Sequence, residues 1–321
     1  MKNIDITVVV PVYNASALIK RCIDSLLSQE GQFTKEVIFV DDGSTDDSSD
    51  IIKSYNNPNF ILIEQENGGP AKARNTGIIA SHGKYLSFID ADDYWDSDFL
   101  KTTLQFMEQH DKIVAVSVGQ RHIIRGKESV IPKCVNDYHE PIIIEDFFSF
   151  WSNYRHVCTG SVVLKTDIAK QIGGQREDLR AGEDWEFWMM VALYGKWAFI
   201  PKVLFTSDGD DVTRTRGWVE KMKPRWETTP PIHEWEKRLL KILPSPLPLS
   251  YKKARGYVAY HMIHAHVLGN RLNLARKETF HYKKDFPLND RLCFLFKVCS
   301  KTYLTWVLMS KLLIWREYHR Y

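Results

Sequence analysis

Three short acidic runs in the first 190 residues contain side chains that can bind a cation or accept a proton. These runs are Asp41-Asp42-Gly43-Ser44-Thr45-Asp46, Asp90-Ala91-Asp92-Asp93 and Gly182-Glu183-Asp184-Trp185. Carboxylates that gather in one place repel each other unless a cation or a cationic substrate group neutralises them. If folding brings the runs together, they predict a metal-dependent site.

The Asp90-Ala91-Asp92 run is the sharpest of the three. Two carboxylates two residues apart at the end of a strand suit a hard divalent cation, Mg²⁺ or Mn²⁺, which diphosphate oxygens also bind. Such a cation stabilises the negative charge on a departing diphosphate. A solvated turn is the alternative, because an isolated Asp-x-Asp occurs by chance in many chains.

The other acidic groups each have a functional and a structural interpretation. Asp184, at the start of a predicted helix, could be a general base that removes a proton from an attacking hydroxyl, but the helix dipole also favours acids there. The segment Asp208-Gly209-Asp210-Asp211 could supply another contact to metal or phosphate, or form a polar loop. Asp41 and Asp42 could bind a nucleobase or ribose, or satisfy free N–H groups where the next helix begins.

Two further segments could contact a nucleotide. Tyr13, in Pro11-Val12-Tyr13-Asn14, could stack on a flat ring or pack on the sheet edge. Asn67-Gly68-Gly69-Pro70 leads into a helix with Lys72 and Arg74, and such an N-terminus could meet phosphate. Taken alone, each segment is better explained as an ordinary loop or turn.

The elements that position these residues alternate between strands and helices. Apolar runs predict strands at 6–12, 35–40, 60–64, 84–89, 112–121 and 161–165, and helical spacing predicts helices at 18–27, 45–55, 70–81, 99–109 and 183–194. This alternation predicts an α/β fold with a doubly wound, mostly parallel, Rossmann-like sheet. The first two acidic runs follow predicted strands, so they should lie at the carboxyl edge, where open α/β sheets bind ligands.

Composition divides the chain into an acidic front and a basic rear. Residues 231–321 hold 17 Lys and Arg against 6 Asp and Glu, whereas residues 1–230 hold 26 against 34. The proline-rich segment 224–250 predicts a linker, and the pattern beyond it is helical to the end. The rear could face an anionic surface, but it lacks a motif that reads a nucleic-acid groove, so we expect no nucleic-acid partner.

The localisation expected from sequence is cytoplasmic. Five scattered cysteines include no Cys-x-x-Cys pair, and the N-terminus shows no apolar leader. Residues 292–316 mix leucines and aromatic residues with Lys297, Lys301 and Lys311, which argues against a spanning helix. This mixture is typical of interfacial helices, and a helical subdomain packed on the catalytic domain is the open alternative.

In their order and spacing, these motifs resemble those of family 2 glycosyltransferases, which have the GT-A fold. The resemblance covers roughly the first 215 residues and does not extend to the rear. It implies a catalytic domain at 1–223, with a nucleotide-sugar half at about 1–95 and an acceptor half at about 96–223. The linker 224–250 and a basic helical region at 251–321 would follow. The matching elements are Val8–Asn14, Val40–Asp46, Asn67–Pro70 with Ala73–Asn75, Phe88–Asp93 and Gly182–Asp184.

The resemblance also implies residue roles. Asp184 would be the catalytic base, with Glu183 and Trp185 beside the acceptor. Asp92 would bind the metal, Mn²⁺ or Mg²⁺. In such enzymes a histidine often supplies a late metal ligand, but here the corresponding position offers Asp208. The implied nucleotide-sugar contacts are Pro11, Tyr13, Asp41, Asp42, Asn67, Arg74, Asp90, Ala91 and Asp92.

The implied reaction is a one-step transfer with inversion from a nucleotide-diphosphate sugar, with UDP favoured, to a hydroxyl of a glycan or lipid-linked oligosaccharide. Such a reaction belongs to bacterial surface-polysaccharide biosynthesis, and a lipid-linked acceptor would place the chain at the inner face of the membrane. The alternative is a catalytically silent GT-A-like protein that binds a nucleotide sugar or glycan. The intact Asp90-Ala91-Asp92 and Glu183-Asp184 runs count against that alternative.

Overall fold

The computed structural model describes residues 4–124, 126–179, 181–208, 216–288 and 290–319, without the side chains of 216–218 and 221. The chain forms two compact units. The first unit comprises Met1–Glu177 and Phe187–Asp211, and the second comprises Asp178–Glu186 and Val212–Tyr321.

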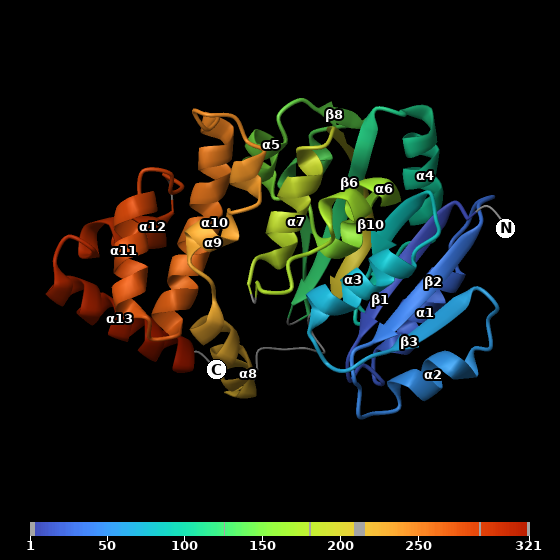
Figure 1. The fold of residues 1–321 in the computed structure, drawn as a ribbon, viewed down its shortest axis with the longest axis horizontal. Helices are drawn as coiled ribbons and strands as arrows, with labels where there is room; N and C mark the ends of the chain where they lie inside the picture. The colour runs from blue at the N-terminus through green and yellow to red at the C-terminus, as the bar shows by residue number, and fades with distance from the viewer. Residues whose placement is uncertain (1–3, 125, 180, 209–215, 289, 320–321) are drawn as a thin grey trace. The chain divides into compact units, whose positions relative to one another are not determined.

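The first unit is built on a mixed sheet, which has ten strands in the described residues (Figure 1). Its order is β3-β2-β1-β4-β9-β6-β10-β5, with β7 beside β6 and β8 beside β10. The strands β1 to β4 are parallel, as predicted, whereas β9 pairs antiparallel with both β4 and β6. The bounds are β1 (Ile6–Val12), β2 (Lys35–Asp41), β3 (Phe60–Glu64), β4 (Tyr85–Phe88), β5 (Tyr94–Trp95), β6 (Ile113–Ile124), β7 (Lys127–Ile131), β8 (Ile142–Ile144), β9 (Val162–Lys165) and β10 (Lys196–Asp208).

Helices pack on both faces of this sheet, which confirms the doubly wound α/β prediction. Val8 and Val10 of β1 share a core with Ile23 of α1, while Val9 points to the other face. There it meets Gly77 of α3 so closely that an added Cβ would lie 2.3 Å from the valine. The bounds are α1 (Ile19–Leu27), α2 (Ser48–Ser54), α3 (Pro70–Ala80), α4 (Phe99–Gln109), η1 (Lys133–Asn136), α5 (Phe147–Tyr154), η2 (Thr159–Ser161), α6 (Thr166–Ile172) and α7 (Glu183–Ala192).

The second unit is helical, as predicted for the rear of the chain. Its longest helix, α10, packs against α8, α11 and α13. A buried polar network fixes this arrangement, since Glu236 accepts hydrogen bonds from Tyr251 at 2.9 Å and Tyr282 at 3.2 Å and pairs with Arg255 at 3.3 Å. The bounds are α8 (Arg216–Thr228), α9 (Ile232–Trp235), η3 (Leu239–Lys241), α10 (Leu249–Leu268), α11 (Leu272–Tyr282), α12 (Arg291–Cys299) and α13 (Tyr303–Tyr318).

The segment 224–250, predicted as a linker, contains the end of α8, all of α9 and η3. Pro224 lies inside α8. The predicted domain limits at 223 and 250 stay a prediction. None of the described helices has both the length and the hydrophobicity that crossing a bilayer requires.

Candidate active site

The loops that follow β1 and β2 are tied into one platform. Asn14, with a positive φ of 49°, accepts a hydrogen bond from the Thr45 amide at 2.8 Å and donates its own amide to Ser44 at 3.0 Å. The Tyr13 side chain is 55% exposed at the end of β1, whereas Pro11 is half-buried within the strand. The structure therefore places an accessible aromatic ring where sequence predicts a nucleobase contact.

Asp42 binds the glycine-rich loop of its own unit. Its carboxylate is 3% exposed and accepts hydrogen bonds from Gln65 at 2.7 Å, the Gly68 amide at 2.9 Å and the Gly69 amide at 2.7 Å. The exposed Asn67 precedes those glycines. Asp42 thus positions the entry to α3, and the predicted contact between Asp42 and a base stays a prediction.

Asp41 and Asp46 hold the start of α2. Asp41 accepts hydrogen bonds from the Ser44 amide at 2.8 Å and from the Ser49 hydroxyl. Burial alone would raise the pKa of Asp46, but hydrogen bonds from Ser48 and Ser16 lower it to about 2. These contacts correspond to the structural alternative from sequence, in which acids of this run satisfy free N–H groups where the next helix begins. Asp41 takes part by accepting the Ser44 amide.

Arg74 connects α3 to the acidic run after β4. Its guanidinium is 6% exposed and contacts Asp90 at 2.6 Å, while Asp90 itself is 38% exposed. The neighbouring Asn75 fixes the same helix to segment 175–177 by accepting from the Gln175 amide at 2.8 Å and donating to Glu177 at 2.8 Å. A buried cation therefore lies beside a carboxylate that can still reach solvent.

The run after β4 concentrates negative charge. Ala91 and Asp93 are each 6% exposed, and Asp92 is half-buried. Burial raises the pKa of the Asp93 carboxyl well above its usual range, and the charges of Asp90 and Asp92 raise it further. Burial also raises the pKa of the Cys22 thiol, as do these three carboxylates. This concentration of carboxylates agrees with the expectation that the run binds a cation.

Asp208 lies near the same run. The Arg21 guanidinium contacts the Asp208 carboxylate at 2.6 Å and donates to the Asp92 carbonyl at 2.7 Å. The antiparallel pairing of β5 with β10, which places Tyr94 opposite Thr206, fixes this proximity. The other members of the predicted segment, residues 209–211, lie outside the described residues.

The donor set fits a metal that takes only part of its ligands from protein. Carboxylate oxygens suit Mg²⁺ or Mn²⁺, and Mg²⁺ commonly takes one or two carboxylates together with substrate phosphates. In the described residues, no group of three or more His, Cys, Asp or Glu side chains is arranged to hold a metal ion. Asp92 and Asp208 would hold the ion only together with oxygens of a bound diphosphate.

The predicted base lies in the second unit, on the first turn of α7. Asp184 and Trp185 are half-buried, and Glu183 is 7% exposed. Trp185 packs against Tyr257 and His261 of α10, with ring centroids 6.1 Å and 5.5 Å apart. Residues of the C-terminal helices thus surround the turn that carries the predicted base.

Three further contacts hold this turn. The Gly182 carbonyl accepts a hydrogen bond from the Trp235 indole at 2.8 Å, and Glu183 lies 3.6 Å from Arg225. Glu186 is fully buried and receives two hydrogen bonds from Arg238, at 2.7 Å and 2.5 Å. The sequence motifs did not indicate Glu186, Arg238 or Arg21. Glu186 pairs with Arg238, and Arg21 pairs with Asp208, and in both pairs the partners lie far apart in the chain.

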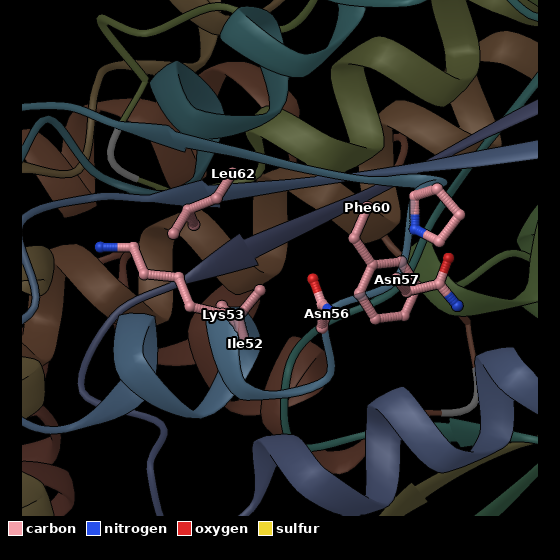
Figure 2. Close-up of a pocket in the computed structure, with 7 residues that line it drawn as sticks. Ile52, Lys53, Asn56, Asn57, Phe60 and Leu62 are labelled. Atoms are coloured by element: carbon pink, nitrogen blue, oxygen red, sulfur yellow. The ribbon is translucent and has the colours of Figure 1, made fainter.

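A pocket of about 300 Å³ lies away from these residues, between α2 and β3 (Figure 2). Its lining includes Phe60 and Leu62 but none of the predicted site residues. Phe60 begins β3, whereas the first two acidic runs lie at the carboxyl ends of β2 and β4. We assign this pocket no part in the predicted site.

Comparison with known protein families matches residues 7–173 to "Glycosyl transferase family 2". The chain belongs to this family. The matched region holds the platform, the glycine-rich loop and the acidic run after β4, and it ends before Asp184 and Asp208. Family 2 membership therefore confirms the resemblance over the region that contains these motifs.

Curated relatives of this family 2 chain are glycosyltransferases. GlyG of Streptococcus pneumoniae serotype 4 is 35% identical over 203 residues, which are 62% of this chain and 58% of GlyG. A poly(ribitol-phosphate) beta-glucosyltransferase of Bacillus spizizenii is 37% identical over 127 residues, 38% of this chain and 20% of that protein. The chain spans only 16% to 58% of the length of the curated relatives that it matches.

Solved structures confirm the GT-A fold. S. aureus TarS 1-349 in complex with UDP-GlcNAc gives a TM-score of 0.65 at 18% identity, covering 98% of this chain and 91% of that chain. The mannosyltransferase PcManGT from Pyrobaculum calidifontis, in complex with GDP-Man and Mn²⁺, gives 0.57 at 20% identity, covering 98% and 86%. At these identities the likeness establishes the architecture alone.

Proposed function

We propose that this family 2 chain is a metal-dependent, inverting glycosyltransferase. It transfers a sugar from a nucleotide-diphosphate sugar, with UDP as the favoured nucleotide, to a hydroxyl of a glycan or lipid-linked oligosaccharide. The observation that carries the proposal is the acidic run after β4, where Asp90 pairs with the buried Arg74 at the carboxyl edge of the sheet. The complexes of TarS with UDP-GlcNAc and of PcManGT with GDP-Man support a nucleotide-sugar donor.

The donor is bound by residues of the first unit. Tyr13 stacks on the nucleobase, because its ring is exposed at the end of β1. Asp42, with Asp41 beside it, and Asn67 shape the base and sugar pocket through the glycine-rich loop. Arg74 orients Asp90 toward the ribose or donor sugar and contributes positive charge near the diphosphate.

Asp92 and Asp208 would hold the cation. The complex of PcManGT with Mn²⁺ supports the use of a divalent cation. When bound with the diphosphate, Mn²⁺ or Mg²⁺ stabilises the negative charge of the leaving group. Arg21 orients the Asp208 carboxylate and fixes the main chain at Asp92, the other acidic residue, since it contacts the Asp208 carboxylate and the Asp92 backbone carbonyl. It also limits the repulsion between them before the ion binds.

Asp184 accepts the proton of the acceptor hydroxyl. The hydroxyl oxygen then forms a bond to the anomeric carbon from the face opposite the nucleotide, while the bond from that carbon to the diphosphate oxygen breaks. This single displacement inverts the anomeric centre. Glu183 and Trp185 contact the acceptor beside the base, with Trp185 offering a ring on which a sugar can pack.

The test is a panel of nucleotide sugars incubated with the full chain and Mn²⁺ or Mg²⁺. We expect one donor to be hydrolysed slowly or transferred to an added glycan, and we expect EDTA to abolish that turnover. NMR of the product's anomeric proton reports inversion. Saturable donor binding without turnover, with or without metal and acceptor, would establish the silent binding protein instead.

A further inference from the structure

One face of α13 leaves large apolar side chains uncovered. Leu304, Leu308, Leu312 and Trp315 are spaced along one side of the helix and are 69%, 60%, 62% and 58% exposed. The opposite side is used by the core of the second unit, where Trp306 is fully buried. The exposed leucines and Trp315 are therefore not needed to pack α13 against the rest of the second unit.

The neighbouring helix continues this property. Phe294 and Val298, one turn apart on α12, are 67% and 43% exposed, and α12 packs against α13. Soluble surfaces rarely expose so many large apolar side chains within two successive helices. Exposed apolar side chains gathered in this way are typical of a surface that binds a protein, a membrane or a ligand.

Within segment 290–319, the exposed charged side chains are all basic. Arg291, Lys301, Lys311 and Arg316 are exposed on or beside α12 and α13. The two acids in the described segment 290–319 are occupied within the fold. Asp290 caps α12 by accepting the Leu292 and Cys293 amides, and Glu317 is 6% exposed.

We propose that the exposed faces of α12 and α13 bind the surface of an anionic lipid bilayer. Leu304, Leu308, Leu312 and Trp315 enter the boundary between headgroups and acyl chains, and the basic side chains meet the lipid phosphates. The helices lie along the bilayer, because none of the described helices can cross it. A second copy of the chain fits less well, since a two-fold contact would bring Lys311 and Arg316 against like charges.

The experiment is flotation of the full chain with two kinds of vesicle. One contains phosphatidylcholine alone, and the other also contains about 30% phosphatidylserine, an anionic lipid. The apolar variant carries Leu304→Gln, Leu308→Gln and Leu312→Gln. Its matched control carries Ile79→Gln, Ile124→Gln and Leu249→Gln, at positions that are 80%, 54% and 70% exposed elsewhere. Circular dichroism and thermal unfolding verify that both variants fold.

We expect the wild-type chain and the control to float with the anionic vesicles, and the apolar variant to bind at least about tenfold more weakly. Lys311→Glu with Arg316→Glu should give a comparable loss, and raising the salt concentration should weaken wild-type binding. Equal flotation of all variants, or no flotation of the wild type, would overturn the proposal. Dimerisation that the apolar variant abolishes, without vesicle binding, would assign the face to a second copy instead.

These variants alter no residue of the proposed donor or base site. Donor hydrolysis in solution therefore reports on the proposed function separately from the flotation. A chain that binds vesicles but hydrolyses no donor would leave the membrane proposal intact and refute the enzymatic one.

Discussion

The donor-side residues and the base-bearing turn are held in place in different ways. Asp42 is bound by amides 26 and 27 residues further along the chain, within one loop-and-helix motif. The first turn of α7 depends on Trp235, Arg225 and Arg238, of which Arg238 lies 52 residues beyond its partner Glu186. The Asp42 loop is therefore held by a nearby segment of the first unit, and the base-bearing turn by helices of the second unit.

This difference predicts that the two halves of the proposed reaction can be disturbed independently. Changes around α7 should impair catalysis while donor affinity is preserved, because the donor residues lie in the first unit. Changes around Asp42 should weaken donor binding first. A single variant that damages both properties equally would contradict the division.

The largest expected effect is that of Asp184→Asn. Loss of the base should lower kcat by about 10²–10⁴-fold, because an amide cannot accept the proton of the acceptor hydroxyl. Donor affinity, measured by calorimetric titration with the nucleotide sugar, should remain unchanged. Asp167→Asn, at an exposed site on α6, is the matched control. Near-normal turnover of Asp184→Asn would remove the base assignment.

Next in size is Arg238→Met. The change keeps the aliphatic stem but leaves the fully buried Glu186 carboxylate without its two hydrogen bonds from Arg238. Breaking a buried pair in this way costs about 3–5 kcal/mol, so the unfolding temperature should fall and kcat should fall with it. The check combines thermal unfolding with separate measurement of kcat and donor KM.

Two control variants test whether the effect of Arg238→Met comes from the buried pair. Lys237→Met removes only an exposed pair with Glu234 at 3.5 Å and should change stability by less than about 1 kcal/mol. Adding Glu186→Gln to Arg238→Met should recover part of the stability, because no unpaired charge remains buried. If Arg238→Met raised the donor KM without lowering kcat, the proposed separation between donor binding and the base-bearing first turn of α7 would be wrong.

These contrasts explain what the sequence could predict. The strands β1 to β4 were predictable because each reads as a continuous apolar run, and the acidic runs follow two of them directly. The long strand β10 was not predicted, since Pro201 and Lys202 interrupt it where its register with β6 shifts. The helix α9, which supplies Trp235, lay in a segment that its prolines had marked as a linker.

For the site, local motifs were visible and distant partners were not. Arg21 contacts Asp208 across 187 residues, and no spacing rule could join them. Its position on α1 reads as an ordinary exposed helical arginine. The same holds for Arg238, whose partner Glu186 reads as one more acid in the first turn of a helix. Ion pairs between residues so far apart in the chain become visible only once the topology is known.

The smallest expected effect is that of Asp42→Asn, which tests the donor side. The aspartate accepts three N–H groups, whereas asparagine offers one oxygen and turns an amino group toward the remaining donors. The mismatch should cost about 1–3 kcal/mol, loosen the loop before α3 and weaken donor binding by calorimetry. Turnover at saturating donor should change less, since α7 is untouched. Asp47→Asn, at an exposed position directly before α2, should leave both properties unchanged. If Asp42→Asn bound donor normally although its unfolding temperature fell, Asp42 would only position the loop, and recognition of the base would rest on Tyr13 and its neighbours.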